Sequence, residues 1–130
     1  MKQIILSISF LIFSTNIFAG ETETACMIVH AGLNSKTCFQ NYGLPKKEFT
    51  LCSFNREMAK DSDGKVTVTS LNNCPDDALG YCEMTYKMEG MNGKYRLYAY
   101  TEIDVDAQKN LSCKDLLPGM ITAKWIDLKK

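Results

Sequence analysis

The chain has 130 residues, and its 15 basic and 15 acidic side chains balance to a formal net charge of zero. Nucleic acids and anionic membrane surfaces attract proteins with a basic excess or a basic stripe, so this balance argues against both as partners. A chain of this length has room for one compact domain with a single core.

The N-terminus has the pattern of a secretory signal peptide. Lys2 precedes an apolar run over residues 4–13, and Ala19 offers a site for signal peptidase. The sequence therefore predicts a signal peptide over residues 1–19 and a single mature domain over residues 20–130, exported to the periplasm or the medium. The apolar run is too short to cross a bilayer and no second run follows, so we expect a mature product that is not embedded in a membrane.

Two parts of the chain, residues 24–72 and residues 81–130 approximately, repeat the same order of features. In the first part a Gly-x-Asn-x-Lys stretch begins at Gly32, and in the second an equivalent stretch begins at Gly90. Each stretch leads into an extended run, then a helix with a start signal, then a cysteine, a glycine and another extended run. The helix signals are Pro45 in the first part, and Asp104 or Asp106 in the second.

This repetition predicts an α+β fold. We expect a small disulfide-braced domain with an antiparallel sheet and two helices, built from two degenerate strand-turn-strand-helix-strand units. The last strand is expected within residues 120–128.

The hairpin of the second unit has the clearest register signal, because Asn92-Gly93 is typical of a type I′ turn. Pairing around this turn places Met88 opposite Leu97 and Glu89 opposite Arg96 as an ion pair. Alternate residues of a strand point to opposite faces. The predicted core face therefore holds Cys82, Met84, Tyr86, Met88, Leu97 and Ala99, and the other face is polar and tyrosine-rich, with Tyr81, Glu83, Thr85, Lys87, Tyr98 and Tyr100.

An even number of cysteines in a small exported chain predicts disulfides, three in this case, made by Cys26, Cys38, Cys52, Cys74, Cys82 and Cys113. The repeat pairs Cys26 with Cys52 and Cys82 with Cys113, which leaves Cys38 with Cys74. A second arrangement joins Cys52 to Cys74 and Cys26 to Cys38. Both contain the bridge from Cys82 to Cys113, which we favour, although six cysteines allow 15 pairings.

The second half also has a recognisable order of residues. Cys74-Pro75, then Gly80 and Cys82, a tyrosine-rich strand, a helix that ends in Cys113, and a glycine followed by Trp125 together resemble small exported, cysteine-rich bacterial proteins of uncharacterised function. The resemblance covers the second half well and the first half loosely. It implies an architecture and no activity.

No set of residues forms a recognisable catalytic, metal-binding or cofactor-binding motif. His30 is the only histidine, so a nucleophile or a zinc ion would depend on it alone. The segment Asp61-Ser62-Asp63-Gly64 looks like a calcium loop, but the first and twelfth ligand positions fall on Ala59 and Ser70. We therefore expect neither an enzyme nor a bound metal or cofactor.

The remaining function is an exported, non-enzymatic binding or interaction module whose ligand is an unknown protein or glycan. Its predicted binding face holds Tyr81, Thr85, Lys87, Tyr98 and Tyr100, because tyrosine supplies contact area and a hydroxyl at low entropic cost. The competing interpretation is that another element covers these rings. Other functions compatible with the scaffold are a secreted inhibitor or toxin that acts on another protein and, third, a small hydrolase.

Overall fold

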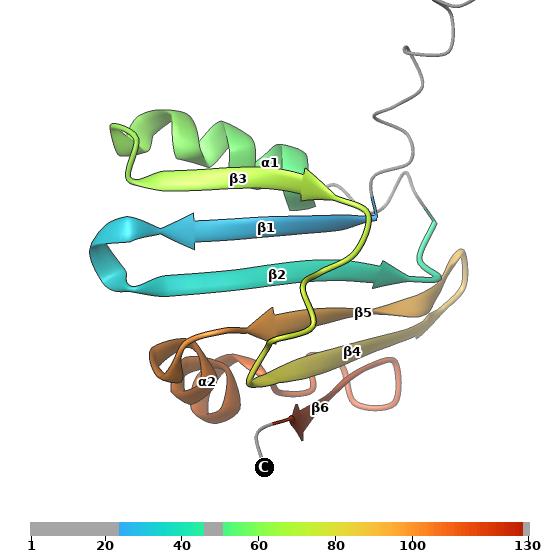
Figure 1. The fold of residues 1–130 in the computed structure, drawn as a ribbon. Coiled ribbons are helices and arrows are strands. Elements are labelled where there is room, and N and C mark those ends of the chain that lie inside the picture. The colour runs from blue at the N-terminus through green and yellow to red at the C-terminus, as the bar shows by residue number, and fades with distance from the viewer. Residues whose placement is uncertain (1–23, 46–50, 129–130) are drawn as a thin grey trace, which may run out of the picture.

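The computed structural model describes residues 24–45 and 51–128, which form a six-stranded antiparallel sheet and two helices (Figure 1). The strands are β1 (Ala25–His30), β2 (Ser35–Tyr42), β3 (Val66–Leu71), β4 (Gly80–Met88), β5 (Met91–Ala99) and β6 (Ile121–Asp127). The helices are α1 (Leu51–Ala59) and α2 (Glu102–Ala107), and the π-helical turn η5 (Gln108–Ser112) continues α2. The predicted fold class, a small disulfide-braced α+β domain, is confirmed. The predicted signal segment lies outside the described residues.

The sheet order, β3-β1-β2-β5-β4-β6, shows how the two units combine. From one edge to the centre the strands are β3, β1 and β2 of the first unit, and from the other edge they are β6, β4 and β5 of the second, in the equivalent order. The two units therefore meet at the antiparallel pair of β2 and β5. Phe39 lies opposite Leu97 in this central pair. The two units thus complete one continuous sheet.

The predicted turn of the β4–β5 hairpin is wrong. Met88 pairs with Met91, so the connecting residues are Glu89 and Gly90, and Asn92 and Gly93 belong to β5. Gly93 is required for close packing instead of for a turn, because a Cβ there would lie 2.5 Å from the carbonyl carbon of Gly43. The glycine allows the backbone after β2 to approach β5 closely.

The register of the β4–β5 hairpin differs from the predicted one, but each side chain lies on the face of the sheet that was predicted for it. Met88 lies opposite Met91 instead of Leu97, a displacement of six positions, and an even displacement keeps each side chain on its face. Tyr81 therefore pairs with Tyr98, and Cys82 with Leu97. The predicted ion pair of Arg96 with Glu89 is also wrong, because Arg96 lies opposite Glu83 and binds it.

Three disulfides brace the two sides of the sheet: Cys26–Cys52, Cys82–Cys113 and Cys38–Cys74, with Cα atoms 5.4, 5.7 and 5.9 Å apart. This is the arrangement that the repeat predicts. The first two attach α1 and the end of η5 to the same side, which we call the helix face, because Cys26 and Cys82 lie in one ladder row with Phe39 and Leu97. The third lies on the opposite side, the pocket face.

The fully buried part of the core is small. Cys26 and Cys38 are the largest side chains that are fully buried in the described part of the chain. On the pocket face the buried cluster of Ala25, Met27 and Cys38 packs against partly buried neighbours that include Tyr98 and Tyr100. Disulfides therefore supply much of the stability that a larger apolar core would otherwise provide.

Helix α2 begins earlier than Asp104, the first of its predicted start residues. Thr101 is its N-cap and accepts a hydrogen bond from the Asp104 amide. The carboxylate of Asp104 is buried and accepts hydrogen bonds from the Ser35 hydroxyl at 2.8 Å and the Lys36 amide at 2.7 Å. Asp104 thus ties the helix to the start of β2.

The first helix is predicted to start near Pro45. The next residues, 46–50, lie outside the described part, and the described helix α1 covers Leu51–Ala59. Neither helix of the described chain is long and apolar enough to cross a membrane.

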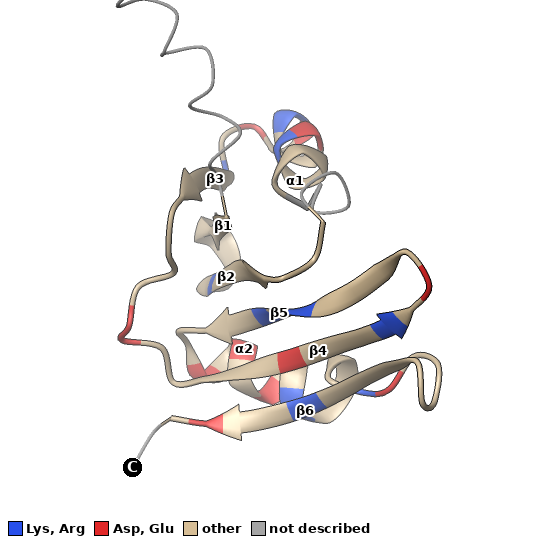
Figure 2. Ribbon diagram, turned by 90° about the vertical axis from the view of Figure 1, so that its right-hand side faces the viewer, with Lys and Arg blue, Asp and Glu red and all other residues tan. Residues whose placement is uncertain are grey.

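The connection between the units, residues 72–79, which we call the linker, must cross most of the sheet. It leaves β3 at one edge and enters β4, four strands further along, a distance of about 19 Å at ordinary strand spacing. Because the helices occupy the helix face, the linker runs over the pocket face (Figure 1). Figure 2 shows α1 and the linker on opposite sides of β1, β2 and β3.

Candidate functional site

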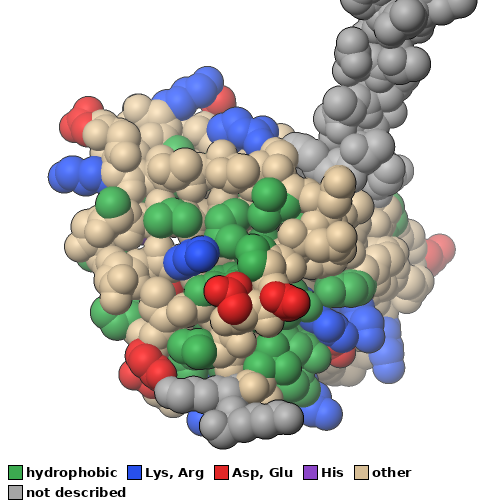
Figure 3. Space-filling view, viewed as in Figure 1, with side chains coloured by type: hydrophobic (Ala, Val, Ile, Leu, Met, Phe, Trp, Pro, Cys, Tyr) green, Lys and Arg blue, Asp and Glu red, His purple; other side chains and the backbone are tan. Residues whose placement is uncertain are grey.

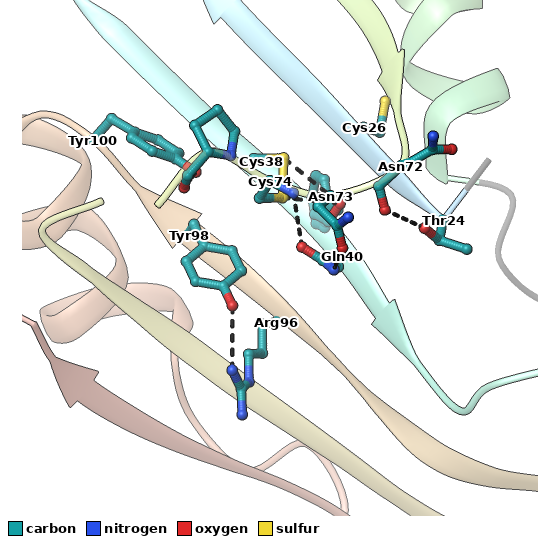
Figure 4. Close-up of a disulfide and its surroundings, with 12 residues drawn as sticks. Thr24, Cys26, Cys38, Gln40, Asn72, Asn73, Cys74, Arg96, Tyr98 and Tyr100 are labelled. Atoms are coloured by element: carbon teal, nitrogen blue, oxygen red, sulfur yellow. Dashed lines mark hydrogen bonds between the residues drawn. A yellow bond between two sulfur atoms is a disulfide. The ribbon is translucent and has the colours of Figure 1, made fainter. Parts of the chain in front are cut away.

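The linker is fixed to the sheet below it by one disulfide and several hydrogen bonds (Figure 4). Besides the Cys38–Cys74 bridge, the Gln40 side chain accepts a hydrogen bond from the Cys74 amide at 2.7 Å and donates one to the Asn73 side chain at 2.9 Å. The Tyr100 hydroxyl donates to the Pro75 carbonyl at 2.7 Å. These contacts hold the linker at a defined height above the tyrosines.

A pocket of about 340 Å³ lies between the linker and the sheet. This volume is at the lower end of the range for small-molecule sites. Figure 3 shows apolar side chains gathered around acidic ones near the centre of this face. The residues that line the pocket come from β2, the linker, β4, β5 and the residue that follows β6: Gln40, Tyr42, Asn73, Cys74, Pro75, Asp76, Ala78, Tyr81, Arg96, Tyr98 and Leu128.

Arg96 is held by hydrogen bonds and ring contacts with the side chains around it. Its Nε donates to a Glu83 carboxylate oxygen at 2.9 Å, and its Nη1 donates to the Tyr98 hydroxyl at 3.2 Å. The Cζ atom lies 4.5 Å from the ring centroid of Tyr42 and 4.4 Å from that of Tyr81. Two cation–π contacts and two hydrogen bonds hold the guanidinium in place before any ligand arrives.

The phenols beside Arg96 form a pair, because the hydroxyls of Tyr42 and Tyr98 share a hydrogen bond of 3.0 Å. Burial, helped by the hydrogen bond and the charge of Tyr98, raises the pKa of Tyr42 to about 12, against the opposing effect of Arg96. Burial alone would lower the pKa of Arg96, but its hydrogen bonds to Tyr98 and Glu83 outweigh burial and raise that pKa. Tyr42 and Arg96 therefore both keep their protons at neutral pH.

This pKa leads to a pH prediction. The difference in tyrosinate absorbance between the wild type and Tyr42→Phe should develop near pH 12, about two units above an exposed tyrosine. Since the folded phenol holds its proton more tightly than the unfolded one, Tyr42 stabilises the fold below pH 10 and this stabilisation is lost as the pH rises to 12. In Tyr98→Phe the same transition should move to lower pH. A Tyr42 transition near pH 10 in the wild type would contradict the buried, hydrogen-bonded pair of Tyr42 and Tyr98.

The predicted binding residues divide into two groups. Tyr81 and Tyr98 line the pocket, and Tyr100 is partly buried below the linker, to which it is hydrogen-bonded. Thr85 and Lys87 share the face of Tyr81 by strand alternation but lie further along β4, outside the pocket. The element that partly covers the rings is the linker.

Sequence reasoning missed Arg96, Tyr42 and Gln40 as parts of one site. Arg96 was assigned to the correct face with the wrong partner, and its true partner Glu83 was on the same predicted face. Figure 2 shows an acidic segment of β4 between basic segments of β5 and β6.

Among residues 24–45 and 51–128, no group of three or more His, Cys, Asp or Glu side chains has the arrangement needed to hold a metal ion. No protein-family model matches the chain, and no curated protein or solved structure shows significant similarity to it. The resemblance to small exported bacterial proteins therefore stays a prediction.

Proposed function

We propose that this protein is an exported, non-enzymatic binding module that holds part of a protein or glycan partner in the pocket beneath the linker. The observation that carries the proposal is the fixed Arg96 guanidinium, which contacts two tyrosine rings and still lines an open pocket. A side chain that is already ordered loses little entropy when a ligand binds, so it contributes more of its interaction energy to affinity.

The protonation states of the pocket support a binding role. A general acid or base works best with a pKa near the operating pH. The pKa of Tyr42 is raised to about 12 and that of Arg96 is raised as well, so neither group exchanges a proton easily at neutral pH. Export is supported by the signal pattern of residues 1–19 together with the disulfides.

A capture experiment with two matched variants tests the proposal. Leu128→Asp places a charge at the pocket wall, and since Leu128 is 43% exposed the change should cost little stability. Lys87→Asp changes an exposed residue of the same face outside the pocket. Wild-type and variant proteins would be immobilised and exposed to envelope extract, culture medium and a glycan array.

We expect the ligand to be retained by the wild type and by Lys87→Asp and lost by Leu128→Asp, with unchanged melting temperatures. A ligand that binds all three proteins equally would contradict the pocket. Loss in Lys87→Asp alone would instead favour the outer part of the tyrosine-rich face.

A further inference from the structure

We propose that the pocket recognises a carboxylate attached to an apolar group, and that Arg96 binds the carboxylate. This inference rests on the proposed function, because it names the chemical group that the binding module accepts. It follows from three properties of the pocket: the unused N–H groups of Arg96 and its neighbours, the charges around them and the apolar wall.

Several donors that line the pocket keep N–H or O–H groups that are not used by the hydrogen bonds between the described residues. A guanidinium has five N–H groups, and within the described part of the chain two of its nitrogens, Nε and Nη1, each donate one hydrogen bond. The Tyr42 and Tyr98 hydroxyls share one of their two hydrogens, which leaves the other for a third group. Asn73 accepts from Gln40 through its oxygen, while its amide nitrogen has no partner among the described residues. A ligand with hydrogen-bond acceptors can therefore bind several of these donors at once.

The charges around the pocket limit how much negative charge a ligand can bring. Glu83 binds two cations, Arg96 at 2.9 Å and Lys94 at 3.5 Å, so these three side chains together keep one positive charge, and the Asp76 carboxylate in the pocket wall offsets it. A carboxylate brings one negative charge and accepts two parallel hydrogen bonds from a guanidinium. A phosphate monoester carries close to two negative charges at neutral pH. Glu83 and the Asp76 carboxylate in the pocket wall would repel the second charge.

The rest of the wall is suited to an apolar group. Pro75, Ala78 and Leu128 line the pocket together with the tyrosine rings. A free small acid and the C-terminal residue of a peptide both present a carboxylate next to such a group. The common chemistry is an apolar monocarboxylate.

The test is an NMR titration of the full, oxidised chain labelled with ¹⁵N. The probes are N-acetylphenylalanine, its neutral amide, and 3-phenylpropionate, which keeps the ring and the acid but lacks the peptide group. We expect the acid to shift the Arg96 Nε–H and Asn73 side-chain signals and to bind about tenfold more tightly than the amide, or better. Comparable binding of 3-phenylpropionate would identify a small acid as sufficient, whereas tighter binding of N-acetylphenylalanine would identify a peptide end; both support the proposal.

Variants of one side chain make the test specific. Arg96→Gln should abolish the preference for the acid over the amide. Arg96→Lys, which keeps the charge and is the fallback if the glutamine variant does not fold, should lose most of that preference because lysine lacks the planar fork. Lys87→Gln removes one positive charge from the same face outside the pocket and should bind as the wild type does.

Three results would overturn the inference. Equal affinity for acid and amide would mean that the pocket binds ligands without selecting a carboxylate. No shift of any pocket signal with either acid would mean that it does not take apolar carboxylates. A preference that survives in Arg96→Gln would assign the carboxylate to another residue. None of these bears on the capture experiment, whose outcome in Leu128→Asp judges the binding function separately.

Discussion

Replacing Cys82 and Cys113 together by serine should lower the free energy of unfolding by about 3–4 kcal/mol. The bridge joins residues 31 positions apart in sequence and restricts the unfolded chain accordingly. A domain of this size has only about 5–15 kcal/mol of stability in total. Urea denaturation of the wild type and the double variant, followed by circular dichroism, measures the difference.

The matched control is the pair Cys38→Ser with Cys74→Ser. Its sequence separation is 36, so the loss of stability should be similar, and this variant should also release the linker and weaken ligand binding. A loss below about 1 kcal/mol for the first pair would contradict the expected role of the Cys82–Cys113 bridge. Peptide mapping under non-reducing conditions should recover all three bridges.

Gly93→Ala should destabilise the fold by about 3 kcal/mol or more. Gly93 has a φ of +146°, and an added Cβ would lie within 2.5–2.7 Å of three backbone atoms of Gly43 and Leu44. Backbone atoms cannot turn aside as a flexible side chain can, so β2 and β5 would have to separate locally. A thermal melt and a urea titration measure the cost.

Gly90→Ala provides the comparison. Gly90 also has a positive φ, +80°, but a Cβ there would contact nothing within 4 Å, so only the conformational cost of about 1 kcal/mol remains. If Asn92-Gly93 formed the turn instead, this order of costs would be reversed. The pair of variants therefore tests the register of the hairpin directly.

The fold could be predicted because its main signals are local or repeated. Cysteine spacing, helix starts and alternation within each unit all point to the same order of elements, and an error in the turn did not matter for the faces. Met88 moved from Leu97 to Met91, an even displacement, so Tyr81 and Tyr98 remained on one side of the sheet and Cys82 on the other.

The pocket could not be predicted because it depends on contacts between units. Tyr42 reaches Arg96 only because β2 pairs with β5, and no local pattern specifies that pairing. The path of the linker is a consequence of the same strand order. Asn92-Gly93 predicts a turn that is not there, because a glycine required for close backbone approach has the same sequence signature as a glycine required for a turn.

The covalent connections divide the molecule differently from the sheet. All six cysteines lie in the described residues, and the Cys26–Cys52 and Cys38–Cys74 bridges interleave along the chain, whereas Cys82–Cys113 stands apart. No disulfide joins the segment that ends at Cys74 to the segment that begins at Cys82. A protease that cut the exposed Asp76-Asp77 pair would leave two polypeptides joined by β-sheet pairing and packing alone. The linker, which covers the pocket, is also the only covalent connection between the two described units. A single proteolytic cut in it would therefore change the pocket and separate the two polypeptides covalently at the same time.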